Sequence, residues 1–184
     1  MGNMYDSWSP LQAVLNTGPH YVLDNQAIWQ GPIDEFGIPC RIAAPLRAEF
    51  DIFPQEDGLL VRGSVTGQVA MPCNRCAEEA VYDLAQRFDN FEPLPSLDEN
   101  GEPATDPDVD EYFIRFSRNG ELEVNLAALA WEEFAQALPP RPLCREECAG
   151  LCPSCGTNLN EGACACEKKI HDPRLAKLRG LKIH

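Results

Sequence analysis

Cysteines are the residues of this 184-residue chain whose type and spacing could do chemistry, and there are nine of them. Six lie between Cys144 and Cys166, in the stretch CREECAGLCPSCGTNLNEGACAC. An odd number of cysteines, and a start (MGNMYDSWSP) without the basic and apolar regions of a secretory signal, disfavour a disulfide framework. Closely spaced thiols in a reducing cytosol are more often metal ligands. The pattern therefore predicts a cytoplasmic protein whose cysteines hold zinc.

Four of the C-terminal cysteines can bind one metal ion without help from the rest of the chain. The first two are spaced Cys-x2-Cys in CPSCG, a turn that brings two thiolates to one tetrahedral zinc. Gly156 permits the positive φ that this turn requires. A Cys-x-Cys pair eight residues further on supplies the other two ligands. The predicted ligands of this site are Cys152, Cys155, Cys164 and Cys166.

The other paired cysteines predict a second site of the same kind. Cys73 and Cys76 are spaced Cys-x2-Cys, and Cys144 and Cys148 are spaced Cys-x3-Cys. A site made from both pairs would clamp the middle of the chain to its C-terminal part, and only Cys40 would be left over. The main alternative is a single zinc held within the six clustered cysteines, with the first pair free or redox-active.

The chemistry expected of these sites is structural. Zinc held by four thiolates keeps no position for water, so it does not act as a catalyst. The three histidines are scattered, no Gly-rich phosphate loop follows a predicted strand, and neither GxSxG nor HExxH occurs. We therefore expect no enzyme, no catalytic residue and no small-molecule substrate.

An antiparallel meander must position the first cysteine pair. Three segments alternate apolar and polar residues, namely LRAEFDIF, LLVRGSVTGQVAM and AVYDLAQRFDNF. The turn QEDG separates the first two, and PCNRC separates the last two, which places Cys73 and Cys76 at a hairpin tip. The residues expected on the apolar faces are Ala48, Phe50, Ile52, Val61, Val65, Val69, Met71, Tyr82, Leu84 and Phe88.

The remaining segments predict shorter elements. Residues 92–111 hold four prolines and eight acids and predict a mobile acidic loop, and a second hairpin, with the turn SRNG, follows. Asn125 predicts the N-cap of a helix over 125–138, which Pro139 and Pro140 stop. Asp172 and the proline after it open a short last helix. Near the N-terminus HYVLDN is a candidate strand, whereas IWQGPIDEFGIP is broken by Gly and Pro and predicts loop or edge structure.

Together these elements predict an α+β fold, in which an antiparallel β-meander packs with one helix and a small Cys-rich module follows. The expected first domain covers residues 1–143 and includes the acidic Pro-rich loop and the helix over 125–138. The expected second domain covers residues 144–184 and consists of the zinc-binding module with a basic C-terminal helix.

Charge limits the partners that such a protein can bind. The formal net charge is −14, which disfavours a large nucleic-acid footprint. Residues 167–184, the basic tail, hold six Lys or Arg against two acids, so the tail carries about +4 and the rest about −18. The apolar runs fall far short of the roughly 20 residues that cross a bilayer, so no membrane association is expected. The candidate partner-binding residues are Lys168, Lys169, Arg174, Lys177 and Arg179, although a solvated basic end explains them equally well.

Three stretches in a fixed order resemble a known family: VRGSVTGQVAMPCNRC, LAALAWEEFAQALPPRPLC, and CAGLCPSCGTNLNEGACAC with DPRLAKLRGL behind it. They resemble the bacterial and plastid YceD family, known as large-subunit ribosomal RNA accumulation proteins. The resemblance covers roughly residues 46–91 and 111–181. It implies a non-enzymatic factor for ribosome biogenesis that supports normal levels of large-subunit (23S) ribosomal RNA.

The resemblance leaves the partner open between large-subunit ribosomal RNA and a basic large-subunit ribosomal protein. RNA would meet the zinc module and the basic tail, whereas an acidic body could hold a basic protein before assembly, which is electrostatically easier. The alternative function is a redox-responsive chaperone or regulator that releases zinc on oxidation and exposes apolar surface. A third interpretation, a zinc ribbon that binds nucleic acid in transcription, is disfavoured by the net charge.

Overall fold

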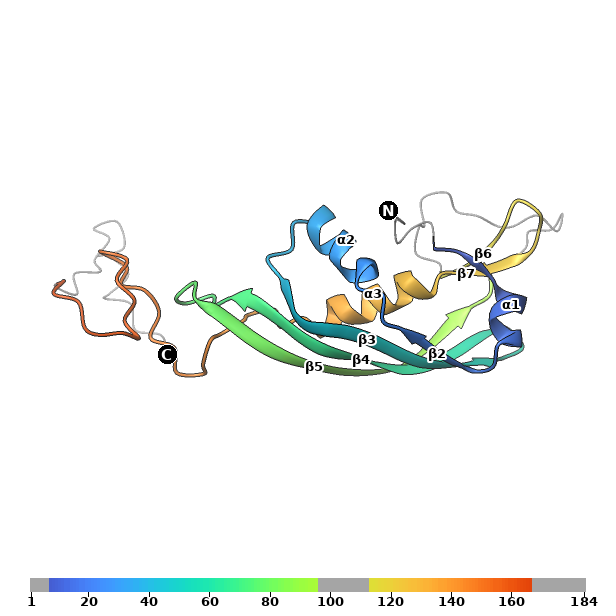
Figure 1. The fold of residues 1–184 in the computed structure, drawn as a ribbon, viewed down its shortest axis with the longest axis horizontal. Helices are drawn as coiled ribbons and strands as arrows, with labels where there is room; N and C mark the ends of the chain where they lie inside the picture. Colours follow the sequence, from blue (N-terminus) through green and yellow to red (C-terminus); the bar gives the residue numbers. More distant parts are fainter. Residues whose placement is uncertain (1–6, 96–112, 167–184) are drawn as a thin grey trace, which may run out of the picture.

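Two antiparallel sheets and three helices form the part of the chain that the computed structural model describes, residues 7–95 and 113–166 (Figure 1). The larger sheet has the strand order β2 (His20–Leu23), β3 (Arg41–Pro54), β4 (Gly58–Pro72) and β5 (Glu79–Pro93). The smaller has the order β1 (Ser9–Pro10), β7 (Leu122–Val124) and β6 (Ile114–Phe116). The helices are α1 (Leu11–Asn16), α2 (Ala27–Glu35) and α3 (Leu126–Ala137). The predicted α+β class of antiparallel sheets with few helices is confirmed.

The long strands β3, β4 and β5 form the predicted meander. Residues 55–57 turn the chain between β3 and β4, where the Gln55 N–H donates to the Gly58 carbonyl at 2.8 Å. Most of the residues expected on the apolar faces are buried, and Tyr82 is half-buried. Gly63 interrupts the alternation in β4 because a Cβ there would lie 2.6 Å from the Phe50 Cβ and 2.7 Å from the Phe88 ring. The glycine therefore leaves room for these two rings, whose centroids lie 6.3 Å apart.

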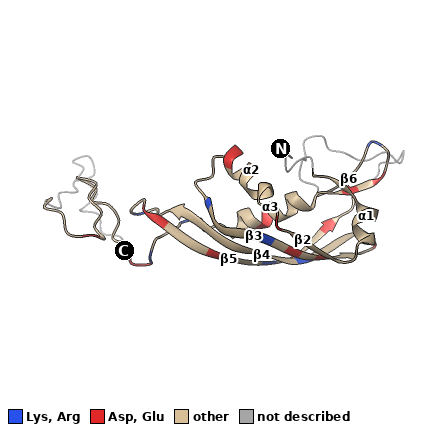
Figure 2. Cartoon of the chain, viewed as in Figure 1, with Lys and Arg blue, Asp and Glu red and all other residues tan. Residues whose placement is uncertain are grey.

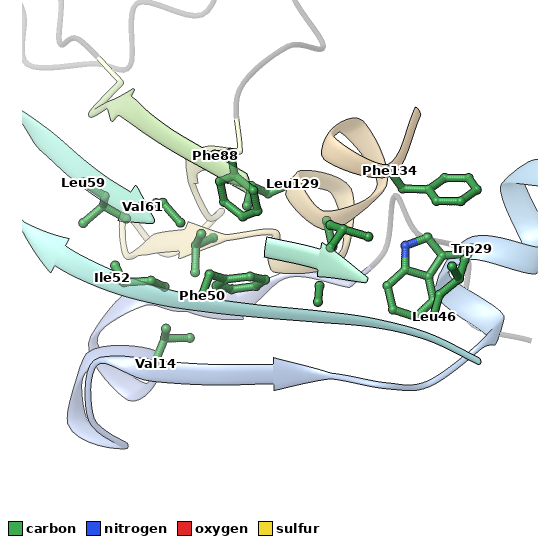
Figure 3. Packing of buried hydrophobic residues seen from close by; sticks show 14 of the residues in the cluster. Val14, Trp29, Leu46, Phe50, Ile52, Leu59, Val61, Phe88, Leu129 and Phe134 are labelled. Atoms are coloured by element: carbon green, nitrogen blue, oxygen red, sulfur yellow. The ribbon is translucent and has the colours of Figure 1, made fainter. Parts of the chain in front are cut away.

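Helices α2 and α3 cover one face of the larger sheet (Figure 1). The predicted N-cap is present, since the Asn125 side chain accepts a hydrogen bond from the Ala128 N–H at 3.0 Å. On the inner face of α3, Leu129 and Phe134 are at most 1 % exposed. Figure 3 shows Phe134 beside Trp29 of α2, above the sheet residues of the same core. The predicted helix over 125–138 is confirmed.

Helix α2 corrects an expectation, because its residues read as loop or edge structure. Gly31 and Pro32 lie inside the helix, yet Trp29 and Ile33, one turn apart, are at most 2 % exposed. Just before the helix, the Gln26 side chain binds both the N–H and the C=O of Leu46, at 2.9 and 2.8 Å. Tertiary packing and this anchor outweigh the low helix propensity of Gly and Pro. Helix α1 was not predicted either.

The remaining expectations have mixed outcomes. The candidate strand near the N-terminus is β2, which pairs with β3, and the hairpin after the acidic loop is β6 with β7. Residues 96–112 of the acidic loop, and the basic tail with its predicted last helix, lie outside the described residues. Within the described ranges, no helix is long and apolar enough to span a membrane.

Basic and acidic residues both occur along the strands of the larger sheet (Figure 2). Exposed cross-strand ion pairs join Arg62 to Asp89 at 2.9 Å and Arg41 to Glu79 at 2.8 Å. Residues 7–95 and 113–166 together hold 19 acids and 9 arginines, so the described part has an excess of about ten negative charges, spread over its surface.

Candidate metal centres

The eight paired cysteines gather into two clusters in which the four Sγ atoms lie within 4.8 Å of one another. Each cluster can therefore hold a metal ion. The structure brings together the same cysteines that their spacing groups, while metal binding by them stays a prediction. We call Cys73, Cys76, Cys144 and Cys148 cluster 1, and Cys152, Cys155, Cys164 and Cys166 cluster 2.

The tip of the β4–β5 hairpin supplies half of cluster 1. The Cys73 N–H donates to the Glu78 carbonyl at 2.8 Å, and the Ala77 N–H donates to the Cys73 carbonyl at 2.9 Å. Ala77 has φ 62°, the one positive φ of a non-glycine residue in the described ranges. This tight turn places both Cys73 and Cys76 inward, each 3 % exposed.

Hydrogen bonds from the hairpin hold in place the segment that carries Cys144 and Cys148, the other two ligands of cluster 1. The Tyr82 hydroxyl donates to the Leu143 carbonyl at 2.8 Å and accepts from the Leu143 N–H. The Arg75 guanidinium donates to the carbonyls of Cys148 and Glu146, at 2.9 and 3.2 Å. Gly150 has φ 74°, and a Cβ there would lie 3.0 Å from the Arg75 carbonyl oxygen, so the chain passes very close to the hairpin tip. Cluster 1 is thus assembled across two distant parts of the sequence.

Cluster 2 is built from a single short stretch that begins with the same turn. The Gly156 N–H donates to the Cys152 carbonyl at 2.8 Å, and Gly156 has φ 74°. An isolated bridge between Leu151 and Asn158 is its one piece of β-pairing within the described ranges. Of its sulfurs only Cys152 is buried, and Cys155 is exposed. This cluster is therefore more open to solvent than cluster 1.

No cysteine is in a disulfide, and two sulfur pairs of cluster 1 lie well beyond bonding distance. Cys73 Sγ lies 3.7 Å from Cys148 Sγ, and Cys76 Sγ lies 3.5 Å from Cys144 Sγ, whereas an S–S bond is about 2.05 Å long. Cys40 belongs to neither cluster. Burial raises the pKa of its half-buried thiol, which makes it a poor nucleophile.

One sulfur in each cluster is strongly favoured as a thiolate. Burial alone raises the pKa of Cys73, but backbone N–H donors of Cys144, Arg75 and Cys76 outweigh it and lower the pKa to about 6. The Thr157 hydroxyl, 3.1 Å from the Cys155 sulfur, and the Thr157 N–H lower the pKa of Cys155 to about 6. Hydrogen bonds thus prepare these sulfurs for a cation.

Another sulfur in each cluster keeps its proton while no cation is bound. Burial raises the pKa of Cys76 to about 12. Hydrogen bonding to Cys155 raises the pKa of Cys166 to about 12, and burial adds to this effect. Each cluster therefore contains both thiolates and protonated thiols. A metal ion that binds all four sulfurs must displace the remaining protons.

Sequence reasoning missed the residues that seat the cysteines. Tyr82 was assigned only to an apolar face, and no role was expected for Arg75 or Asn160, whose amide lies 3.3 Å from the Cys148 sulfur. Their function depends on contacts that spacing does not report. The candidate partner-binding residues lie in the basic tail, outside the described residues, so they remain a prediction.

A family model described as large ribosomal RNA subunit accumulation protein YceD matches residues 61–182. This span is about two thirds of the chain and includes most of β4 together with β5, α3 and both clusters. No solved structure matches the chain.

Three of the relatives come from a plant and from mycobacteria. A chloroplastic YCED homolog 1 of Arabidopsis thaliana, named as a large ribosomal RNA subunit accumulation protein, is 24 % identical over 163 residues, which cover 75 % of this chain and 49 % of the relative. Uncharacterised proteins of Mycobacterium bovis and Mycobacterium tuberculosis are each 29 % identical over 122 residues, covering 66 % of this chain and 55 % of each relative. The chain thus spans about half the length of the curated relatives it matches.

Proposed function

Since the chain belongs to the YceD family of large ribosomal RNA subunit accumulation proteins, we propose that it is a non-enzymatic factor in ribosome biogenesis. It supports the accumulation of large-subunit ribosomal RNA by binding that RNA, a ribosomal protein, or both. The observation that carries this proposal is the family match over residues 61–182, because this span holds most of the β4–β5 hairpin, α3 and both clusters. The motif resemblance expected from the sequence is confirmed at the level of the family.

Each cluster, in this proposal, holds one structural Zn2+. A tetrahedral zinc with metal–sulfur bonds of about 2.3 Å has sulfur–sulfur edges of about 3.8 Å. The distances of 3.7 and 3.5 Å within cluster 1 agree with such edges to within a few tenths of an ångström. A bound zinc would neutralise part of the thiolate charge and fix the four sulfurs. The residues around it hold the sulfurs in place, and the closed shell leaves no position for a substrate.

The domain division proposed here separates residues 1–143 from residues 144–184. The first has its own apolar core, which reaches from Leu11 to Phe134, whereas in the described part of the second, residues 144–166, the buried residues are mostly cysteines. Cluster 1 then ties the two units together, because Cys73 and Cys76 come from the first and Cys144 and Cys148 from the second.

A basic large-subunit ribosomal protein is the partner that the charges favour. A zinc held by four thiolates carries a net charge of about −2, so two such sites take the chain from −14 to about −18. The metal-loaded clusters therefore repel RNA more than the sequence charge suggests. RNA contact would depend on the basic tail, and the acidic surface fits a cationic protein.

Two experiments in cells test this function. Loss of the protein should lower large-subunit relative to small-subunit ribosomal RNA, seen as a deficit of large subunits in a sucrose gradient. Cys152→Ser with Cys155→Ser should fail to rescue, whereas Cys40→Ser, the matched control outside both clusters, should rescue. Normal subunit ratios in the deletion strain would reject the proposal.

Affinity purification with and without ribonuclease separates the two partner classes. A basic ribosomal protein that stays bound after ribonuclease treatment supports the protein partner. A yield that depends on intact RNA, and that falls when Lys168, Lys169 and Arg174 are changed to glutamate, supports RNA instead.

A redox-responsive regulator is the second candidate, and Cys155 is the observation that favours it. This sulfur is exposed and its pKa is lowered to about 6, so it is a reactive thiolate in the metal-free state. Oxidation by peroxide would join two thiolates as a disulfide, reduce the peroxide to water and release the metal. Mild peroxide should then release zinc and expose apolar surface. A structural site should keep its metal under the same conditions.

A further inference from the structure

The loop between the two halves of cluster 2, residues 156–163, folds back onto the chain that joins the clusters. The Leu159 N–H donates to the Gly150 carbonyl at 2.8 Å. The Cys152 N–H donates to the Thr157 carbonyl at 2.8 Å. This loop, which we call the cluster-2 loop, therefore lies against residues 149–152, directly after the last ligand of cluster 1.

Asn160 extends these contacts to a sulfur of cluster 1. Its Oδ1 accepts a hydrogen bond from the Ala149 N–H at 2.8 Å, and its Nδ2 lies 3.3 Å from Cys148 Sγ. The same Nδ2 lies 2.8 Å from Asn158 Oδ1, which also accepts from the Asn160 N–H at 3.0 Å. The amide is thus fixed on both sides, with its N–H group aimed at the sulfur. Asn160, which lies between the ligands of cluster 2, therefore contacts Cys148, a ligand of cluster 1.

We infer that Asn160 couples the two metal sites, so that metal in cluster 2 raises the metal affinity of cluster 1. The inference rests on the two metal sites proposed above and adds a positioning residue that acts through Cys148. Because a coupling free energy is shared, metal in cluster 1 must raise the affinity of cluster 2 by the same factor.

The physical basis is the closure of the cluster-2 loop. With a metal bound, the pairs Cys152–Cys155 and Cys164–Cys166 fix both ends of the loop, and Asn160 is held against Cys148 without further ordering cost. Without metal, the loop is ordered by a few hydrogen bonds and has no buried residue of its own, so placing Asn160 costs conformational entropy. The hydrogen bond to the thiolate then contributes less, so cluster 1 binds its metal more weakly.

Metal titration of the full chain tests the coupling, with Co2+ as a spectroscopic probe and Zn2+ in competition with a chelator. Cys164→Ser combined with Cys166→Ser removes cluster 2 and should weaken metal binding at cluster 1 about 10–100-fold, the effect typical of losing an outer-shell partner. Cys73→Ser combined with Cys76→Ser should weaken cluster 2 by the same factor. Equal affinities with and without the other cluster would overturn the inference.

Asn160 variants test the route of the coupling. Asn160→Ala in the otherwise intact chain should also weaken cluster 1 about 10–100-fold, and it should add nothing once cluster 2 is removed. Asn160→Asp keeps the oxygen that accepts from Ala149 but loses the N–H that reaches the sulfur, so it should behave like alanine. Wild-type affinity of the Asp variant would show that the sulfur contact is not the link. Asn119→Ala, in the exposed turn between β6 and β7, is the matched control and should change neither site.

Failure of the metal sites and failure of the coupling give different results. Fewer than two metal ions bound by the wild-type chain would refute the sites themselves. Two ions that bind independently would leave the sites standing and refute the coupling. The cluster-removal measurements need no Asn160 variant, so the test does not depend on how well those variants fold.

Discussion

The two cysteine clusters share one turn and differ in what surrounds it. In both, the residue after the second cysteine has a positive φ, and its N–H donates to the carbonyl of the first cysteine. Cluster 1 places this turn at the end of two paired strands of 15 residues and buries three of its sulfurs. Cluster 2 takes all its ligands from residues 152–166 and buries only Cys152.

This difference indicates that a metal would do different work in the two places. The β4–β5 hairpin has a full ladder of backbone hydrogen bonds and an apolar core beneath it, so it does not need the metal to fold. Cluster 2 has a single bridge, Leu151 with Asn158, and almost no apolar core. In cluster 1 the metal would attach one folded part to another, whereas in cluster 2 it would create the fold.

Metal removal should give the largest effect. Structural zinc contributes roughly 10–16 kcal/mol in small peptides, far more than the apolar contacts of residues 144–166 can supply. Chelation should therefore remove amide protection from residues 144–166 while β3, β4 and β5 stay protected, as measured by hydrogen exchange. Protection that persists around residues 150–160 after the metal is gone would contradict the comparison.

The metal content of variants sharpens the comparison. Wild-type protein purified under reducing conditions should contain about two zinc ions per chain by elemental analysis, one per cluster. Cys73→Ser should lower this to about one, and Cys40→Ser should leave it at about two. A wild-type content near one that Cys73→Ser does not change would show that the hairpin tip is not part of a site.

Tyr82→Phe should weaken cluster 1 and spare the turn of cluster 2. The change removes the hydroxyl that bonds both backbone groups of Leu143, and losing a partly buried partner of this kind costs about 1–2 kcal/mol. We expect metal affinity at cluster 1 to fall about tenfold in a chelator competition, with at most a smaller change at cluster 2. Tyr21→Phe removes a hydroxyl from the edge strand β2, where Tyr21 pairs with Phe50 of β3, and it should leave both affinities unchanged.

A reciprocal exchange of the turn residues should give the smallest effect. Ala77 adopts φ 62°, where a residue with a Cβ costs about 1–2 kcal/mol, so Ala77→Gly should stabilise the protein by a few tenths to about 1 kcal/mol after the added chain entropy. Gly156→Ala should destabilise residues 152–166 by about 1 kcal/mol. Denaturant unfolding measures the first change, and local hydrogen exchange the second. If both substitutions changed stability in the same direction, the two turns would not be equivalent.

Sequence patterns predicted the parts of the fold that residues close together in the sequence determine. Alternation located the meander, and Asn125 with the two prolines located α3. The same alternation placed the start of β3 at Leu46, whereas the strand begins at Arg41. The pairing of β3 with β4 shifts register between Ile42 and Ala44 and again before Arg47, which breaks the period of two.

The rest depended on contacts between residues far apart in the sequence. Trp29 and Ile33 have helical spacing, but Gly31 and Pro32 between them hid it, and only the core explains why the helix forms. Cysteine spacing grouped the sulfurs correctly because a tetrahedral zinc site takes four ligands, so two cysteine pairs make one site. It carried no information on Tyr82, which lies 61 residues from its partner Leu143, nor on the amide of Asn160.

The β4–β5 hairpin also sets a length. Fifteen residues at about 3.3 Å each make an arm of roughly 50 Å, with the turn at residues 55–57 at one end and cluster 1 at the other. In Figure 1 the cysteine-rich segment lies beyond the tip of this arm, away from the helices. Because side chains alternate between faces, the arm keeps its buried face only if both strands gain or lose residues in twos. The distance between the helix-covered body and the cysteine-rich end can therefore change during evolution only in steps of two residues, or about 7 Å.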